Sequence, residues 1–289
     1  MSGKRPLPPA DINDRGLNTF EPFSSAIVST ALLNDRVIWR NLWNDPSALT
    51  AHATPTSPPL WSRLMPNTDP AATATPLESA QLTELARRVI ALMPENGRIL
   101  VGIAGSPGAG KTTLAIQVAA RINELVGSDD CAVHLPMDGH HLANATLDRL
   151  GRHDRKGAID TFDGWGFLAL LRRLLTEYNH TVYAPSFDRR VDEGIAAEIA
   201  VQPSARVVMV EGNYLLADSE PWLQISTLLA ESWFCETSEH ERLRRLVDRH
   251  ERHGRSPEAA LAWAESVDGK NALLIEATRP RATLTVSGQ

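Results

Sequence analysis

Residues 105–112 combine glycines, a lysine and a threonine at a spacing that suits the binding of phosphate groups. The segment reads Gly-Ser-Pro-Gly-Ala-Gly-Lys-Thr, which is the pattern G-x-x-x-x-G-K-T. Its glycines allow the backbone to wrap around phosphates with N–H groups pointing inward. Lys111 would reach the β- and γ-phosphates of a nucleotide, and the Thr112 hydroxyl would ligate Mg²⁺. The residues expected to bind the nucleotide are Gly105, Ser106, Pro107, Gly108, Ala109, Gly110, Lys111, Thr112 and Thr113.

The segments on either side of this loop suit the same interpretation. Residues 98–104 form a short apolar run, as expected for a strand that is buried on both faces of a parallel sheet. Apolar residues then recur at helical spacing from Leu114 to Leu125, so a helix would begin where the loop ends. A helix N-terminus adds the positive end of its dipole to a phosphate site. This context argues against a chance match in a glycine-rich turn.

Polar residues follow three later apolar runs at the points where strands would end. In α/β proteins, ligands gather at the carboxyl ends of the strands, so these residues form a candidate site. A single acid at such a position could merely cap the following loop. Three such stretches beside a phosphate-binding loop favour a site instead. They are 137–141 with Asp138, 183–189 with Arg189, and 211–214 with Glu211.

Asp138 and Glu211 suit two tasks in phosphoryl transfer to a hydroxyl group. The reaction needs a carboxylate that orients the acceptor and takes its proton late, and we assign this base to Asp138. Glu211, at the end of the most apolar run, would hold Mg²⁺ together with Thr112, directly or through water. The two roles could also be exchanged or shared between these carboxylates.

The paired histidines after Asp138 are candidates for the acceptor side of the site. They lack the cysteine or histidine partners at the spacing of a zinc site, so zinc is not expected. We expect one histidine to face the acceptor and the other to face solvent. We place His140 on the acceptor side.

Two further charged segments could cover the site. Residues 155–163 mix both charges with a glycine and no periodicity, which indicates a loop over the site or, alternatively, a solvated turn. Ser238 and Glu241 form a capping box for a helix with arginines along one face. Such a stripe is either a solvated face paired with acids or a lid that closes over a triphosphate, and both alternatives stay open. The arginines are Arg242, Arg245, Arg249 and Arg252, with Arg245 and Arg249 as the favoured contacts.

Apolar runs and helical patterns alternate from residue 77 onward, which is the signature of an α/β fold. We therefore predict a mostly parallel sheet of about five strands, flanked by helices and carrying a helical lid. Strands are expected at 98–104, 131–136, 181–185, 207–211, 232–235 and 283–286. Helices are expected at 82–93, 114–125, 165–178, 221–229, 239–252 and 257–267.

Residues 1–75 differ from the rest of the chain through their many prolines, which break helices and central strands. We predict a largely irregular, Pro-rich N-terminal extension at 1–75 and one domain at 76–289. The stretch 24–42 leaves room for a short helix that docks on this domain. Alternatively, translation starts naturally at Met65 and the upstream residues are not part of the protein.

The composition argues against several classes of protein. Of the 289 residues, 43% are hydrophobic and 22% charged, and the net charge of −6 argues against general binding to nucleic acids or anionic membranes. Cys131 and Cys235 lie in apolar stretches, as reduced core thiols do. No apolar run approaches the roughly 18 residues of a membrane span, and no signal peptide is evident, so the cytoplasm is the expected location. A homodimer is the common default for the oligomeric state.

An ordered series of motifs runs from residue 77 onward. The motifs are 105–112, Pro-Met-Asp138-Gly, Arg-Lys-Gly157, Asp160-Thr-Phe-Asp163, Tyr-x-Pro-x-Phe-Asp188-Arg189 and Glu211-Gly-Asn-Tyr-Leu-Leu216. This series resembles the P-loop small-molecule kinases, a group that includes uridine kinase, pantothenate kinase and phosphoribulokinase. It is most similar to the bacterial nucleoside/nucleotide kinases, some of which are labelled fructose transport system kinases.

The resemblance implies a P-loop NTPase fold, ATP and Mg²⁺ at the loop, Asp138 as the base, and an arginine-bearing lid at 242–255. It also places four residues around the acceptor, namely Asp163, Tyr183, Phe187 and Arg189.

Two positions depart from the pattern of this family. His140 stands where the family usually has phenylalanine, and Ile159 stands where it usually has proline. Both lie on the acceptor side, so the acceptor can differ from that of any familiar relative.

The leading hypothesis is an ATP-dependent kinase that transfers the γ-phosphoryl group to a hydroxyl of a sugar, a nucleoside or a pantothenate-like compound. A second hypothesis is a nucleotide-dependent switch or regulatory module, which would hydrolyse ATP without an acceptor. A third is a degenerate kinase that serves as a binding module. The intact Lys111, Thr112, Asp138 and Glu211 argue against the third.

Overall fold

The computed structural model describes residues 79–288. The predicted N-terminal extension at 1–75, its possible docking helix and the alternative start at Met65 lie outside the described residues.

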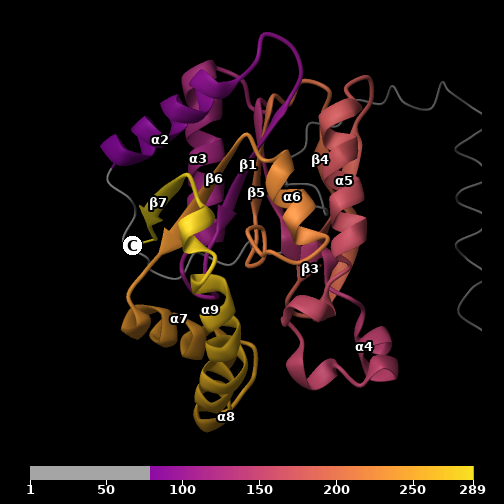
Figure 1. Cartoon of the computed structure of the whole chain (residues 1–289), viewed down its shortest axis with the longest axis vertical. Helices are drawn as coiled ribbons and strands as arrows, with labels where there is room; N and C mark the ends of the chain where they lie inside the picture. Colours follow the sequence, from indigo (N-terminus) through magenta and orange to yellow (C-terminus); the bar gives the residue numbers. More distant parts are fainter. Residues whose placement is uncertain (1–78, 289) are drawn as a thin grey trace, which may run out of the picture. The chain divides into compact units, whose positions relative to one another are not determined.

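Five parallel strands form the central sheet, in the order β2-β5-β1-β6-β7 (Figure 1). Every residue of β1 and β5 is buried, as expected for apolar runs that have neighbours on both faces. The predicted α/β fold with a mostly parallel sheet of about five strands is confirmed. The strands are β1 Ile99–Ala104, β2 Ala132–Pro136, β5 Val207–Glu211, β6 Glu231–Glu236 and β7 Leu284–Ser287.

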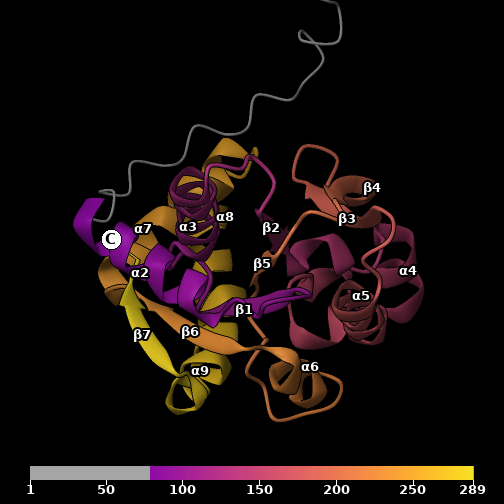
Figure 2. The same ribbon diagram turned by 90° about the horizontal axis from the view of Figure 1, so that it is seen from above.

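Helices cover both faces of this sheet and divide the core into two parts. On one face, α2 and α3 pack their buried residues, such as Val89 and Val118, against β1, β5 and β6. On the other face lie α5 and α6, with Phe167 and Trp222 in the core. Figures 1 and 2 show these two layers on either side of the strands. The helices are α2 Ser79–Leu92, α3 Lys111–Val126, α5 Gly164–Thr176 and α6 Trp222–Leu228.

The strand expected at 181–185 does not join the parallel sheet. Strand β3, Val182–Asp188, pairs antiparallel with β4, Glu193–Val201, and the two form a separate hairpin. Strand β4 was not predicted, because its residues are mostly exposed and do not alternate between apolar and polar. Arg189 therefore approaches the site on the tip of a hairpin rather than at the end of a strand in the sheet.

Additional helices surround the carboxyl ends of the strands. Helix α7 begins after its cap Ser238 and spans the predicted range, whereas the helix predicted at 257–267 is α8 followed by a π-helical turn and then α9. Figure 1 places α4, α7 and α8 at the same end of the molecule. No helix between residues 79 and 288 is long and apolar enough to cross a membrane. The elements are α4 Asn144–Leu150, α7 Glu239–Arg252, α8 Pro257–Trp263, η6 Ala264–Asp268 and α9 Gly269–Glu276, with the short turns η3 Met137–His140, η4 His153–Arg155, η5 Ile159–Thr161 and η7 Arg279–Arg281.

Arg98, just before β1, ties three segments together at the opposite end of the sheet from these helices. Its side chain is buried and donates to the carbonyl oxygens of Ala205 at 2.8 Å, Gln202 at 2.7 Å and Leu174 at 3.1 Å. Leu174 belongs to the last turn of α5, where helix carbonyls lack partners within the helix. One guanidinium therefore satisfies buried carbonyls from α5 and from the turn before β5.

Replacing this guanidinium should destabilise the fold. We expect Arg98→Met to lower the free energy of unfolding by about 3 kcal/mol, because buried carbonyls lose their charged donor. Urea denaturation followed by circular dichroism measures this. Arg87→Met, at an exposed position of α2, is the matched control and should change stability by less than about 0.5 kcal/mol. Equal midpoints for the two variants would contradict this role of Arg98.

Candidate active site

A cavity of about 850 Å³ lies at the carboxyl ends of β1, β2 and β5. Ligand sites of α/β proteins occur at this position, and the volume is in the range of small-molecule sites. Its walls come from the loop at 105–112, η3, the tip of the β3–β4 hairpin, the end of β5, and helices α7 and α8. Among the residues that line it are Lys111, Thr112, Asp138, Arg189, Glu211 and Arg249.

The glycine-rich loop joins β1 directly to α3. Gly108 and Gly110 have φ angles of 81° and 99°, in the left-handed region that favours glycine, so the loop needs glycine at these positions. Lys111 begins α3, is buried, and donates from Nζ to the Ser106 carbonyl at 3.1 Å. Burial lowers the pKa of Lys111, although Glu211 nearby acts against this effect.

The nine residues expected to bind the nucleotide divide into two groups. One group lines the cavity, while the other lies behind the loop, where Ser106 is fully buried and its Oγ donates to Glu276 Oε1 of α9 at 2.6 Å. The cavity side consists of Pro107, Gly108, Gly110, Lys111, Thr112 and Thr113, and the rear consists of Gly105, Ser106 and Ala109.

Thr112 and Glu211 meet at the floor of the cavity. Strand β5 pairs with β1 so that Glu211 aligns with Ile103, two residues before the loop begins. The hydroxyl of Thr112 donates to Glu211 Oε1 at 3.0 Å, and Glu211 is 5% exposed. A hydroxyl and a carboxylate are hard oxygen donors of the kind that Mg²⁺ prefers, so these two side chains fit a magnesium site.

Asp138 lies on the η3 turn directly after β2, and β2 is aligned with β5 so that Pro136 pairs with Glu211. Its Oδ2 accepts from Arg189 Nη2 at 3.2 Å. Burial raises the pKa of Asp138, but nearby charged and polar groups outweigh this effect and hold the pKa below that of an ordinary aspartate. These groups are His141, Arg189, Lys111 and Arg249.

The two histidines occupy different positions from those expected. His140 does not line the cavity; it packs against Phe167 with ring centroids 4.9 Å apart, and burial lowers its pKa to about 4. His141 lines the cavity, with its ring 4.0 Å from Phe162 and 4.6 Å from Phe187. Its Nδ1 is 2.8 Å from the backbone oxygen of Asp138. The η3 turn rotates His140 into the core, which the sequence alone did not reveal.

The remaining residues expected around the acceptor also divide. Phe187 and Arg189 line the cavity. Tyr183 is 58% exposed on β3 and lies outside the cavity, because its neighbours Val182 and Ala184 are buried and successive side chains of a strand point to opposite faces. Asp163 also lies outside the cavity and instead caps α5, accepting from the Gly166 N–H at 2.8 Å.

The segment 155–163 borders the cavity through residues that the sequence analysis did not assign to the site. Lys156 lines the cavity and donates from Nζ to Asp192 Oδ2 at 2.9 Å and to Asn144 Oδ1 at 2.6 Å. This ties the hairpin tip to α4 and to the loop. Tyr214 donates from its hydroxyl to the Gly157 carbonyl at 2.7 Å, which holds the segment 155–163 against the start of the turn after β5. Mixed charge predicted a loop here but not which of its residues face inward.

Three of the four arginines of the α7 stripe line the cavity, and Arg242 does not. Arg249 and Arg252 line the cavity, and burial lowers the pKa of Arg249, with Arg189 nearby adding to the effect. Arg245 also reaches the cavity, but its guanidinium bonds Glu241 and two carbonyl oxygens, including that of Gly108. Its expected contact with a triphosphate stays a prediction.

Comparisons with known proteins agree with this geometry. No family model matches the chain. The chain is 38% identical over 143 residues to a "putative uridine kinase" of Schizosaccharomyces pombe, an alignment that covers 48% of this chain and 60% of that protein. It is 41% identical over 133 residues to the ATP-dependent kinase-like protein notR' of Aspergillus versicolor, covering 44% of this chain and 77% of that protein.

A solved structure covers more of the chain. The crystal structure of a "putative fructose transport system kinase" from a Silicibacter species has a TM-score of 0.66 and 38% sequence identity. It covers 71% of this chain and 98% of that protein. The family suggested by the sequence motifs is thus confirmed, and the chain belongs to the ATP-dependent P-loop kinases, phosphotransferases that act on small-molecule hydroxyl groups.

Proposed function

We propose that this chain transfers the γ-phosphoryl group of ATP to a hydroxyl of a sugar, a nucleoside or a pantothenate-like compound, and that residues 76–289 form the kinase domain. One observation carries the proposal. The Thr112–Glu211 pair and Asp138 open into the same cavity as Lys111, so a nucleotide site and a carboxylate for the acceptor face a common space.

The proposal assigns the donor side to the loop and to the end of β5. Lys111 would bind the β- and γ-phosphates, and Thr112 and Glu211 would hold Mg²⁺. When bound, Mg²⁺ would neutralise negative charge on these phosphates. Arg249 reaches the same space from α7 and would stabilise the charge on the phosphoryl group during transfer.

Asp138 would act on the acceptor side. The acceptor oxygen forms a bond to the γ-phosphorus while the bond to the β–γ bridging oxygen breaks, so that ADP leaves, and the acceptor proton passes to Asp138. A carboxylate with a lowered pKa is ionised and ready to accept a hydrogen bond from the acceptor hydroxyl. Such a weak base takes the proton late, which suits a loose transition state.

A panel of acceptors tests this function. With Mg²⁺-ATP, we expect ADP formation that depends on one class of sugar, nucleoside or pantothenate-like compound, measured by a coupled ADP assay. Asp138→Asn should lower kcat by at least about a hundredfold with ATP binding retained, because the base is lost. Lys111→Ala should abolish turnover.

Asp129→Asn, at an exposed position, is the matched control for Asp138→Asn and should turn over normally. Full activity of Asp138→Asn would contradict the assignment of the base. ATP hydrolysis that no acceptor in a broad panel increases would favour a nucleotide-dependent switch instead.

The magnesium site has a separate test. Glu211→Gln removes the carboxylate charge, so the Mg²⁺ concentration that half-saturates turnover should rise about tenfold or more. Glu84→Gln, at an exposed position of α2, should leave the Mg²⁺ dependence unchanged. A Glu211→Gln enzyme with an unaltered Mg²⁺ titration would rule out the assigned ligand.

The lowered pKa of Asp138 leads to a pH prediction. Asp138 is ionised above its pKa, so kcat/KM should hold as pH falls until that lowered pKa is reached. Arg189→Met removes one cause of the lowering, so the pKa rises and the acidic fall in kcat/KM should begin at a higher pH. Arg190→Met is the control because its guanidinium bonds Asp188 instead. If kcat/KM of Arg189→Met began to fall at the same pH as that of the wild type, Arg189 would not lower the pKa of Asp138.

A further inference from the structure

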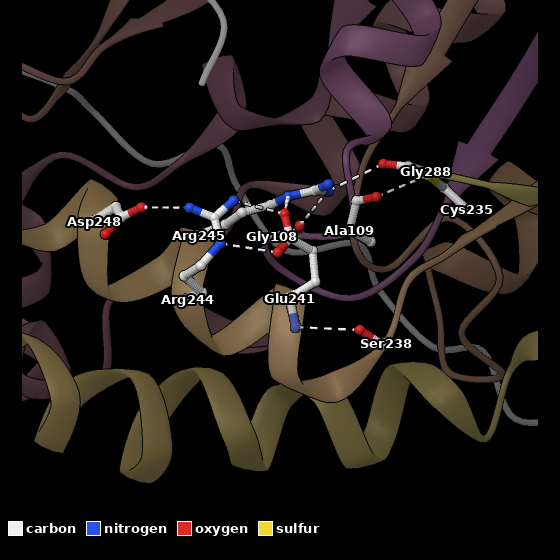
Figure 3. Close-up of polar contacts among 9 residues, drawn as sticks. All are labelled: Gly108, Ala109, Cys235, Ser238, Glu241, Arg244, Arg245, Asp248 and Gly288. Carbon is white, nitrogen blue, oxygen red and sulfur yellow. Dashed lines mark hydrogen bonds and ion pairs between the residues drawn. The ribbon is translucent and has the colours of Figure 1, made fainter. Parts of the chain in front are cut away.

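Arg245 of α7 lies beside the glycine-rich loop, lines the cavity, and is held by hydrogen bonds to several groups of the protein. Its Nε donates to Glu241 Oε1 at 2.7 Å, and its Nη1 donates to the carbonyl oxygens of Gly288 at 3.0 Å and Gly108 at 3.4 Å. Its side chain is 10% exposed. Figure 3 shows the guanidinium between the loop and Gly288. Arg245 thus bonds one carboxylate and two backbone carbonyl oxygens of the protein itself.

Gly288, directly after β7, touches the loop through its backbone. Its N–H donates to the Glu236 carbonyl at 2.7 Å, which keeps it alongside β6. A Cβ added to Gly288 would lie 1.8 Å from the Ala109 oxygen, and one added to Gly110 would lie 2.8 Å from the Gly288 oxygen. Glycine at 288 is therefore required for this approach of two backbones.

Cys235 of β6 holds the next carbonyl of the loop. Its Sγ donates to the Ala109 oxygen at 3.2 Å, and burial raises its pKa to about 12, so the thiol keeps its proton. The carbonyls of Gly108 and Ala109 thus both accept hydrogen bonds from side chains outside the loop. Because the C=O and N–H of a trans peptide point in opposite directions, fixing the Ala109 carbonyl directs the Gly110 N–H away from β6. Gly110 lines the cavity, where a phosphate would accept from this N–H.

We propose that Cys235, Arg245 and Gly288 form a clasp that sets the conformation of the glycine-rich loop before the nucleotide binds. Glycine-rich segments lose much conformational freedom when they become ordered, and that loss weakens binding unless the loop is ordered beforehand. Arg245 is in this account a positioning residue, which acts on the phosphates through the loop. The inference rests on the proposed binding of nucleotide at 105–112 but not on the identity of the acceptor.

The clasp and a direct contact between Arg245 and the γ-phosphate predict different nucleotide preferences. A misplaced loop should weaken the binding of ADP and of ATP alike, since the loop would surround the β-phosphate that both nucleotides carry. Loss of a side chain that touches the γ-phosphate should weaken the binding of ATP and leave the binding of ADP unchanged. The dissociation constants of ADP and ATP, measured by isothermal titration calorimetry on the full chain with Mg²⁺, separate the two roles.

For Arg245→Met we expect both dissociation constants to rise by roughly tenfold, because the loop loses its charged donor. Arg245→Lys should recover part of the loss, as a single ammonium can serve one of the two carbonyls. In turnover assays, KM for ATP should rise more than kcat falls. Arg244→Met is the matched control, since Arg244 bonds Glu241 and Asp248 of its own helix.

Gly288→Ala disturbs the clasp at its contact with Ala109 and should weaken the binding of ADP and of ATP to a similar degree. Thermal unfolding of each nucleotide-free variant identifies any general loss of folding, and Arg245→Lys remains informative if Gly288→Ala does not fold. Unchanged affinities in Arg245→Met, or a loss confined to ATP, would overturn the clasp while leaving the proposed function intact. A wild-type chain that binds neither ADP nor ATP would overturn the proposed function itself.

Discussion

The pairing of β5 with both β1 and β2 is the constraint on which the site depends. Because β5 lies between them in parallel register, its last residue Glu211 is level with Ile103 and with Pro136. The loop after β1 and the η3 turn after β2 therefore begin on either side of one buried carboxylate. Thr112 reaches that carboxylate from the loop, and Asp138 opens into the same cavity from the turn.

Burial shifts the pKa values of the cationic and the anionic side chains of the cavity in opposite directions. Burial lowers the pKa of Lys111 and of Arg249, since their charged forms lose hydration. Asp138 experiences the same loss of hydration, yet the cations around it keep it ionised. The carboxylates and cations of the cavity thus stabilise each other's charged forms. The cavity lining as a whole carries eight Lys and Arg side chains against four Asp and Glu side chains, Arg249 among the cations, so an incoming triphosphate would meet an excess of positive charge.

The tip of the hairpin and the C-terminal elements complete the site from outside the sheet. Lys156 connects the hairpin tip to α4, and Arg189 then reaches Asp138 from that tip. Near the glycine-rich loop, Arg245 bonds the carbonyl oxygens of both Gly108 and Gly288 and so supports the loop. Both supports come from segments distant in sequence from the residues that they position. The chemistry therefore depends on long-range packing as well as on the motif at 105–112.

The features predicted well from the sequence are those that a local pattern determines. A buried parallel strand must be apolar throughout, and a phosphate-binding loop needs glycines, so β1, the loop and Glu211 could all be located in advance. Strand β4 could not, because its exposed residues carry no periodic pattern. His140 and His141 are adjacent in sequence, and which of them enters the cavity depends on the rotation of the η3 turn. Asp163 has a carboxylate that could act in catalysis, but it serves as a helix cap. Aspartate is common in both roles, so its residue type alone does not tell them apart.

The direction in which the γ-phosphate points decides whether phosphoryl transfer toward Asp138 is possible. A crystal structure with Mg²⁺ and a non-hydrolysable ATP analogue shows this direction. We predict that the γ-phosphate lies beside Lys111 Nζ, faces the carboxylate of Asp138 across the cavity, and has its metal on Thr112 and Glu211. A γ-phosphate that points away from Asp138, with the metal bound elsewhere, would contradict it.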